Sequence, residues 1–320
     1  MNEIFFLFFA FLTVFLSIKL SYYADVLSKT GKISNALVGG IVLAGVTSLP
    51  EFVTCFTAVF ASNPALAMGD VLGSNLFNFF MICVFDLFFV RKMIFRFSSS
   101  KHNVTLFLLI VNYVFLFLFC TVFLKFNFSY IGVPSLVIFC TYLFYVFIVS
   151  KGEDDSVIIR NSCIRVNNVV LKLIVTAICM VLSSLLLTII VNNLSLLYPS
   201  FSSSFLGAIF LGVTTSLPEV VTFYALINVN NYDLALANII GSNMFNMLVL
   251  ALADLFCFSG SIYSFSESGT VLIILFGLVF SSLCLFSNCR KGNVSFFRYL
   301  LISLVVVLLY LGFWIVNFLR

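Results

Sequence analysis

The chain has 320 residues, of which 62% are hydrophobic and 9% charged, and its formal net charge is +4. Soluble domains carry about 25% charged residues, so this composition excludes an ordinary soluble protein. Nothing in the small net charge indicates a nucleic-acid partner. The apolar residues form runs long enough to cross a bilayer as helices. We therefore expect an integral membrane protein.

The apolar runs predict about ten transmembrane helices. In chain order we place them at residues 3–20, 33–61, 65–90, 104–124, 130–150, 168–192, 201–228, 233–257, 268–288 and 297–319. The first run has an acidic residue and no basic residue before its apolar core, so we interpret it as a helix and not as a signal peptide. The polar segment 151–167 separates two halves, residues 1–150 and 168–320, with five helices each.

The basic residues predict how the chain is oriented in the membrane. With ten crossings, fourteen of the sixteen lysines and arginines fall on one side, and only Lys125 and Arg320 fall on the other. Cytoplasmic segments are enriched in these residues. We therefore expect both termini outside the cell and 151–167 in the cytoplasm. We expect the protein in the plasma or inner membrane. Five spans per half also mean that repeated halves would be inverted.

The two halves carry the same motif. Residues 47–78 align with 215–246 without a gap, at an offset of 168, and fifteen of the 32 positions are identical. The shared residues include TSLPE, a GSN triplet and an FN pair, which chance similarity between apolar stretches does not align. We therefore predict an all-α polytopic membrane protein with about ten transmembrane helices in two inverted five-helix repeats, with the motifs in 40–80 and 207–248.

Each motif places side-chain oxygens inside a membrane span. In the first copy a proline interrupts the helix, and Thr47, Ser48 and Glu51 can converge on one side of it. On the next helix, Ser74 and Asn78 are four residues apart and share a face. The second copy supplies the same set: Thr215, Ser216, Glu219, Ser242 and Asn246.

Two carboxylates among neutral oxygens are typical of a site for a hard cation. Ca²⁺ accepts several oxygen ligands in flexible geometry, and two glutamates neutralise one divalent ion. An uncompensated charge inside a membrane costs a few kcal/mol or more. An empty site must therefore be compensated by other cations or by protons, and this requirement favours antiport.

These residues resemble the motifs of the sodium/calcium exchanger family, the cation/Ca²⁺ antiporters. The chain reads GVTSLPE and GDVLGSNLFN in the first half, and VTTSLPE and ANIIGSNMFN in the second. The resemblance covers both repeats and implies ten helices in two inverted halves. It also implies ion sites between the second, third, seventh and eighth spans, with the first and sixth spans sliding across that core.

The resemblance implies a set of ion ligands. Glu51 and Glu219 match the central calcium-binding carboxylates. The other implied ligands are the hydroxyl residues Thr47, Ser48, Thr215 and Ser216, the sodium-site serines Ser74 and Ser242, and the backbone-carbonyl positions Ala44 and Gly212. Some family members carry an aspartate in place of Asn78 or Asn246, so this chain keeps two formal charges at the site.

Three polar residues of the motifs have open roles. Asn75 and Asn243 lie one step off the face of the ligand helices, and we interpret them as packing or supporting residues. Asp70 stands where the family often has asparagine. It is either a polar residue near the membrane face or an additional, protonatable residue of the site.

Three further residues fall outside the motifs. Asp86 and Asp254 match at the same offset of 168, and we expect interfacial capping or pairing, with Asp86 near Arg91; a role in ion entry is the alternative. His102 lies in the polar stretch SSSKHN, and we predict a solvated surface histidine instead of a proton relay.

We expect a secondary active antiporter that exchanges Ca²⁺ for Na⁺ by alternating access at one site. The chain has no nucleotide-binding motif, so we expect neither an enzyme nor a cofactor, and inorganic cations and the lipid bilayer are its only predicted partners. The alternatives are H⁺/Ca²⁺ exchange, K⁺-dependent exchange, a channel-like cation pore, and a membrane scaffold that transports nothing.

Overall fold

The computed structural model describes residues 2–28, 44–89, 94–97, 101–122, 132–150, 166–198, 201–228, 230–290 and 296–318. Nearly all of them are helical. The predicted linker 151–167 and most of the basic residues used for the orientation, Arg91 among them, lie outside the described residues or at their margins.

The described helices follow the predicted spans. Up to residue 150 they are α1 (Asn2–Ser28), α3 (Ala44–Thr47), α4 (Leu49–Phe60), α5 (Pro64–Phe88), the 3₁₀ helix η3 (Ile94–Phe97), α6 (Lys101–Thr121) and α7 (Val133–Ser150). Beyond it they are α8 (Val166–Leu197), α9 (Ser203–Leu206), the π-helix η5 (Gly207–Gly212), α10 (Val213–Thr215), α11 (Leu217–Asn228), α12 (Tyr232–Leu255), the 3₁₀ helix η6 (Ile262–Phe265), α13 (Ser268–Cys289) and α14 (Phe296–Phe318).

The helices form an all-α membrane protein, as predicted. Among the described residues, five helices are long and apolar enough to cross a membrane, or six when the bent segment from α9 to α11 is taken as one span. The remaining predicted spans correspond to shorter apolar helices in α1, α4, α7 and α14. Every predicted span thus has a helix at its place in the chain.

The helix breaks fall where the motif places its prolines. Ser48 separates α3 from α4, and Ser216 separates α10 from α11, where the span bends by 42°. In each copy the proline is the second residue of the following helix. N–H groups in the first turn of a helix have no carbonyl partner within it, so the missing N–H of proline costs no hydrogen bond of that helix. The break therefore leaves the TSLPE side chains at a helix start inside the protein.

The two repeats share backbone detail in the turn within the aligned motif. Ser62 and Asn230 both adopt positive φ, at 59° and 58°. The following residues, Asn63 and Asn231, cap α5 and α12 by accepting hydrogen bonds from the third N–H group. Each of these pairs is separated by 168 residues, so equivalent sequences build the same turn in both halves.

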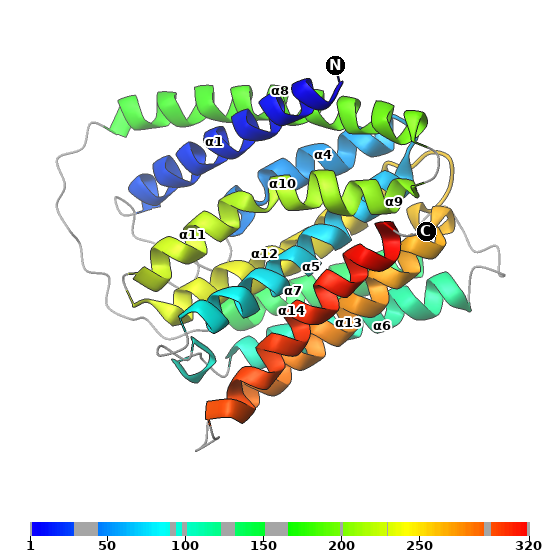
Figure 1. Cartoon of the computed structure of the whole chain (residues 1–320). Helices are drawn as coiled ribbons and strands as arrows, with labels where there is room; N and C mark the ends of the chain where they lie inside the picture. Colours follow the sequence, from blue (N-terminus) through cyan, green and yellow to red (C-terminus); the bar gives the residue numbers. More distant parts are fainter. Residues whose placement is uncertain are drawn as a thin grey trace.

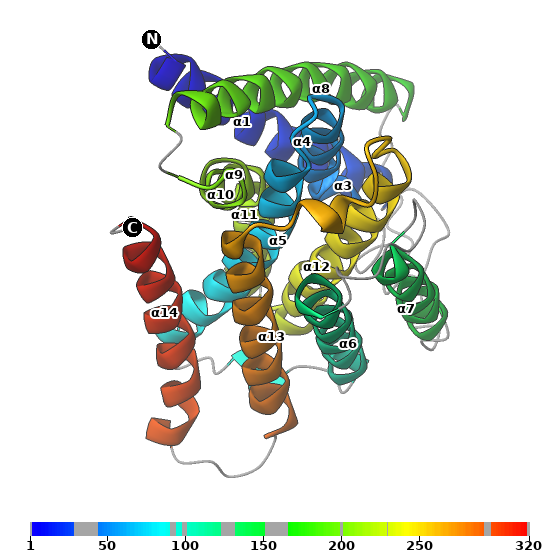
Figure 2. The same cartoon turned by 90° about the vertical axis from the view of Figure 1, so that its right-hand side faces the viewer.

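α5 and α12 lie in the middle of the molecule, packed against each other (Figure 1). On one side, α4 and the segment from α9 to α11 lie between these two helices and the α1–α8 pair, as Figure 2 shows from another direction. On the other side lie α6, α7, α13 and α14. The two broken spans therefore meet the two central helices at the core.

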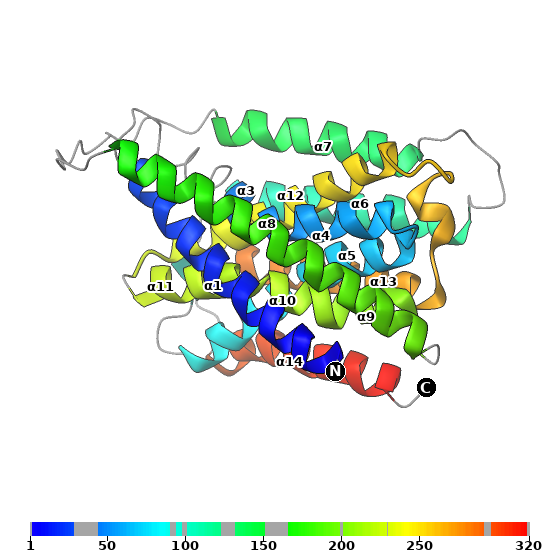
Figure 3. The ribbon, with the colours of Figure 1, turned by 90° about the horizontal axis from the view of Figure 1, so that it is seen from above.

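α1 and α8 lie side by side over this core (Figure 3). A hydrogen bond between Thr13 Oγ1 and Ser183 Oγ, 2.7 Å apart, joins them. Many of their large apolar side chains are exposed, for example Phe11 and Leu171. Such a surface suits contact with lipid, which solvates apolar side chains as well as the protein interior does.

Glycines bring α5 against η5 at backbone distance. A Cβ added to Gly73 would lie 2.3 Å from Ala208 Cα, and one added to Gly207 would lie 2.4 Å from the carbonyl oxygen of Leu66. Small residues allow helices in membranes to approach closely. This contact places the second-half break directly beside the polar face of α5.

We predict that Gly73→Ala destabilises the protein, because the new methyl group collides with the η5 backbone. Overpacking of this kind costs about 1–3 kcal/mol. Gly312→Ala on α14 is the matched control, since a Cβ there meets nothing within 4 Å. Thermal unfolding of the two variants in detergent checks this; equal melting temperatures would contradict the packing described.

Candidate functional site

The ten side chains that the sequence proposed as ligands are all buried, each with 0% exposure, in one region of the core. They are Thr47, Ser48, Glu51, Ser74, Asn78, Thr215, Ser216, Glu219, Ser242 and Asn246. They come from the two helix breaks and from the middle of α5 and α12. Ala44 and Gly212, the two backbone positions, are buried beside them.

Each glutamate is held by the opposite repeat. Ser48 Oγ donates to Glu219 Oε1 over 2.9 Å, and Ser216 Oγ donates to Glu51 Oε1 over 3.1 Å. The two bonds are related by the offset of 168. One oxygen of each carboxylate is therefore fixed by a hydroxyl group, and the two breaks face each other.

The threonine and serine hydroxyls form a second pair of contacts across the repeats. Thr47 Oγ1 lies 3.3 Å from Ser242 Oγ, and Thr215 Oγ1 lies 3.5 Å from Ser74 Oγ. Backbone carbonyls join them: Thr47 donates to Ala44 O over 3.1 Å, and Ser74 donates to Gly212 O over 3.2 Å. The structure thus brings together neutral oxygens from both backbone positions that the sequence singled out.

Asn75 and Asn243 connect the two central helices. Asn243 Oδ1 accepts from Asn78 Nδ2 over 2.9 Å, and Asn75 Oδ1 accepts from Asn246 Nδ2 over 3.1 Å. The sequence predicts both as packing or supporting residues and does not identify the groups that they contact. Their matching places in the two GSN triplets are the only signal in the sequence, because the crossing of α5 and α12 decides which asparagines meet.

Four buried oxygens of the ten proposed ligand side chains have no hydrogen-bond partner. They are Glu51 Oε2, Glu219 Oε2, Asn78 Oδ1 and Asn246 Oδ1. All four are acceptors when the glutamates are ionised, and a buried acceptor without a donor is costly. A cation compensates this cost, and oxygen ligands of this kind suit hard cations such as Ca²⁺ and Na⁺.

Asp70 is fully buried one turn from Ser74 on α5, and not at the edge of the protein. Thr54 Oγ1 donates to its Oδ2, whereas its Oδ1 has no partner. Its carboxylate also lies within electrostatic range of Glu51. Of the two roles left open by the sequence, this burial with a partnerless oxygen favours an additional residue of the site.

Asp86 and Asp254 cap structural elements in both repeats. Asp86 accepts from Ile94 N over 3.2 Å and from Ser303 Oγ over 2.7 Å. Asp254 accepts from Ile262 N over 2.7 Å and from Ser135 Oγ over 2.8 Å. All three pairs differ by 168 residues. Each aspartate thus binds the start of a 3₁₀ helix and a serine of the other half, which favours capping over ion entry.

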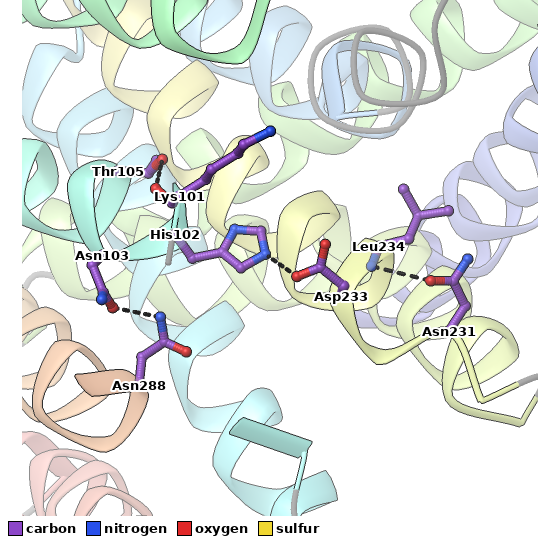
Figure 4. Close-up of polar contacts among 8 residues, drawn as sticks. All are labelled: Lys101, His102, Asn103, Thr105, Asn231, Asp233, Leu234 and Asn288. Carbon is purple, nitrogen blue, oxygen red and sulfur yellow. Dashed lines mark hydrogen bonds and ion pairs between the residues drawn. The ribbon is translucent and has the colours of Figure 1, made fainter. Parts of the chain in front are cut away.

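His102 is not a solvated surface residue, which corrects the prediction from its polar surroundings. It is 8% exposed, and its Nε2 lies 2.8 Å from Asp233 Oδ1 at the start of α12 (Figure 4). Next to it, Asn288 on α13 donates to Asn103. The prediction failed because α6 already begins at Lys101, so the histidine lies in a helical turn packed against neighbouring helices.

The sequence matches the family described as "Sodium/calcium exchanger protein" over residues 3–151 and 168–319. It is 24% identical over 301 residues to inner membrane protein YrbG of Escherichia coli (strain K12), with 88% of each chain covered.

The fold is also similar to solved structures. The sodium-calcium exchanger NCX_Mj matches with a TM-score of 0.59 at 19% identity, covering 96% of this chain and 97% of the other. The H⁺/Ca²⁺ exchanger CAX matches with a TM-score of 0.64 at 13% identity, covering 99% and 88%. With its two family-matched halves and this fold, the chain belongs to the sodium/calcium exchanger family and is a membrane transporter of the cation/Ca²⁺ exchanger superfamily, not an enzyme.

Proposed function

We propose that the protein exchanges Ca²⁺ for Na⁺ across the membrane, with both ions using the buried cluster by turns. The observation that carries the proposal is the set of four partnerless acceptor oxygens, two from each repeat. The two glutamates supply two negative charges, which one Ca²⁺ balances. In the proposed ligand set, the hydroxyls of Thr47, Ser48, Ser74, Thr215, Ser216 and Ser242 and the carbonyls of Ala44 and Gly212 complete the coordination.

Alternating access is proposed to follow from the arrangement of the helices. A protein with two buried carboxylates and no bound cation resists switching the site from one side of the membrane to the other, because the uncompensated charge is costly. The ion-loaded forms are therefore the ones that switch between opening to one side and opening to the other. In the proposal, α1 and α8 slide together over the core while α5 and α12 hold the site.

The choice of Na⁺ over H⁺ rests on the neutral oxygens. A proton needs one carboxylate oxygen, whereas Na⁺ needs several oxygen ligands, and the serines and threonines paired across the repeats provide them. Proton coupling is the second candidate because Asp70 adds a third buried carboxylate with a partnerless oxygen. Structural likeness to exchangers of both kinds does not decide between them.

The proposed domain organisation and topology follow the sequence. Residues 1–150 and 168–320 form two inverted halves joined by a cytoplasmic linker at 151–167, and both termini lie outside the cell. We propose the plasma or inner membrane as the location. The relative from Escherichia coli is named as an inner membrane protein.

Coupling to Na⁺ predicts that ⁴⁵Ca²⁺ enters proteoliposomes loaded with Na⁺ and not those loaded with choline at the same pH on both sides. The Na⁺ gradient supplies the energy, since no nucleotide does. If choline-loaded vesicles take up as much Ca²⁺ when a pH gradient is imposed, the counter-ion is H⁺ and not Na⁺.

Glu51→Gln and Glu219→Gln should each lower Ca²⁺ uptake by roughly tenfold or more, a factor that corresponds to about 1.4 kcal/mol. Each change removes one of two charges that face the ion and keeps the serine bond geometry. Glu267→Gln is the matched control, because Glu267 caps α13 outside the cluster. Uptake that falls equally in all three variants would indicate a general loss of folded protein instead.

The proposed topology predicts that alkaline phosphatase fused after residue 320 is active in a bacterial host and that green fluorescent protein there is dark. Fusions after residue 160 should give the opposite pattern, because phosphatase folds only outside the cytoplasm. Fluorescence at the C-terminus with active phosphatase at residue 160 would show the opposite orientation. The same result at both points would contradict five spans in the second half.

A further inference from the structure

Four asparagines meet where α5 and α12 cross. Asn75 and Asn78 come from α5, Asn243 and Asn246 come from α12, and all four have 0% exposure. Asn78 and Asn246 belong to the proposed ligand set. The roles of Asn75 and Asn243 lie outside that set, although each of them lies between the two helices and contacts both a backbone carbonyl and a ligand.

The backbone carbonyls determine how the first two amides are turned. Asn75 Nδ2 donates to Asn243 O over 3.2 Å, and Asn243 Nδ2 donates to Asn75 O over 3.4 Å. A carbonyl oxygen only accepts hydrogen bonds, so the amide nitrogen of each residue must face it. The side-chain oxygen of each residue consequently points the other way.

The fixed oxygens then determine how the ligand amides are turned. Asn243 Oδ1 accepts from Asn78 Nδ2, and Asn75 Oδ1 accepts from Asn246 Nδ2. Both ligand nitrogens are thereby occupied. The remaining atoms, Asn78 Oδ1 and Asn246 Oδ1, are the ones without a partner.

The reversed orientation is excluded by the same contacts. If the Asn78 amide turned over, its oxygen would face Asn243 Oδ1, so two acceptors would meet with no hydrogen between them. Its NH₂ group would take the place of the free oxygen and present two donors to a cation. Buried polar groups without suitable partners are disfavoured. Replacing the free oxygen by an NH₂ group would also weaken cation binding directly.

We infer that Asn75 and Asn243 are positioning residues that hold the amide oxygens of Asn246 and Asn78 toward the transported cation. This rests on the proposed function, because it requires a cation at the cluster. It assigns the GSN asparagines a role in ion affinity beyond packing. It also means that each ligand asparagine is oriented by a residue of the opposite repeat.

The test compares two substitutions at one position. Asn243→Leu and Asn243→Asp both lose the nitrogen that bonds Asn75 O, but only leucine also loses the oxygen that accepts from Asn78. We expect leucine to weaken ⁴⁵Ca²⁺ binding to the purified protein by tenfold or more, and aspartate not to weaken it. A merely structural residue would respond to the loss of the nitrogen, so both variants would bind more weakly.

A double-mutant cycle keeps the test independent of stability. In an Asn78→Ala background the ligand amide is absent, so Asn243→Leu should change the Ca²⁺ dissociation constant less than twofold. Asn112→Leu is the control for a buried membrane asparagine outside the cluster, since Asn112 lies on α6 and accepts from Thr141 on α7. It should lower the melting temperature without changing Ca²⁺ affinity.

The outcomes separate the two proposals. Equal Ca²⁺ affinity in the wild type and in Asn243→Leu would overturn the positioning role and leave the exchange function intact. The same is true if the leucine effect persists unchanged in the Asn78→Ala background. A wild-type protein that binds no Ca²⁺ would overturn the proposed function, and the positioning role with it. If Asn243→Leu does not fold, Asn75→Leu tests the symmetric claim through Asn246.

Discussion

The structure depends on two buried carboxylates that face each other across the pseudo-symmetric core. An ionised glutamate away from water must be hydrogen-bonded and paired with a positive charge. Ser48 and Ser216 meet the first need, each for the glutamate of the other repeat. The second need remains for a cation, because Glu51 Oε2 and Glu219 Oε2 have no protein partner. In this account, the missing positive charge is supplied by the transported cation.

The helix breaks, the close glycine contacts and the asparagine cluster all serve this arrangement. In each motif a new helix begins directly after the serine, with the proline as its second residue and the glutamate as its third. Gly73 and Gly207 let α5 approach η5 closely enough for Ser74 to reach Gly212 O. Because every one of these contacts joins the two halves, neither repeat can build the site alone.

Much of the fold could be predicted from the sequence, because apolar runs and a repeated motif are visible in the order of the residues without knowledge of tertiary contacts. Within the aligned motif, the offset of 168 relates Ser62 to Asn230, with φ of 59° and 58°. It also extends further than the motif, because it relates Asp86 to Asp254, and each of these caps a 3₁₀ helix. Pairings across the repeats could not be predicted. Which asparagines meet depends on how α5 and α12 cross, and His102 was misjudged because a polar stretch hid the first turn of α6.

The central claim is that one cation binds between the two glutamates. Anomalous diffraction from crystals soaked with Ca²⁺, recorded at long wavelength, tests it most directly. The account predicts a single strong peak about 2.3–2.6 Å from oxygens of both Glu51 and Glu219, the distance at which Ca²⁺ binds oxygen ligands. A peak coordinated by only one repeat, or no peak between the two helix breaks, would contradict it.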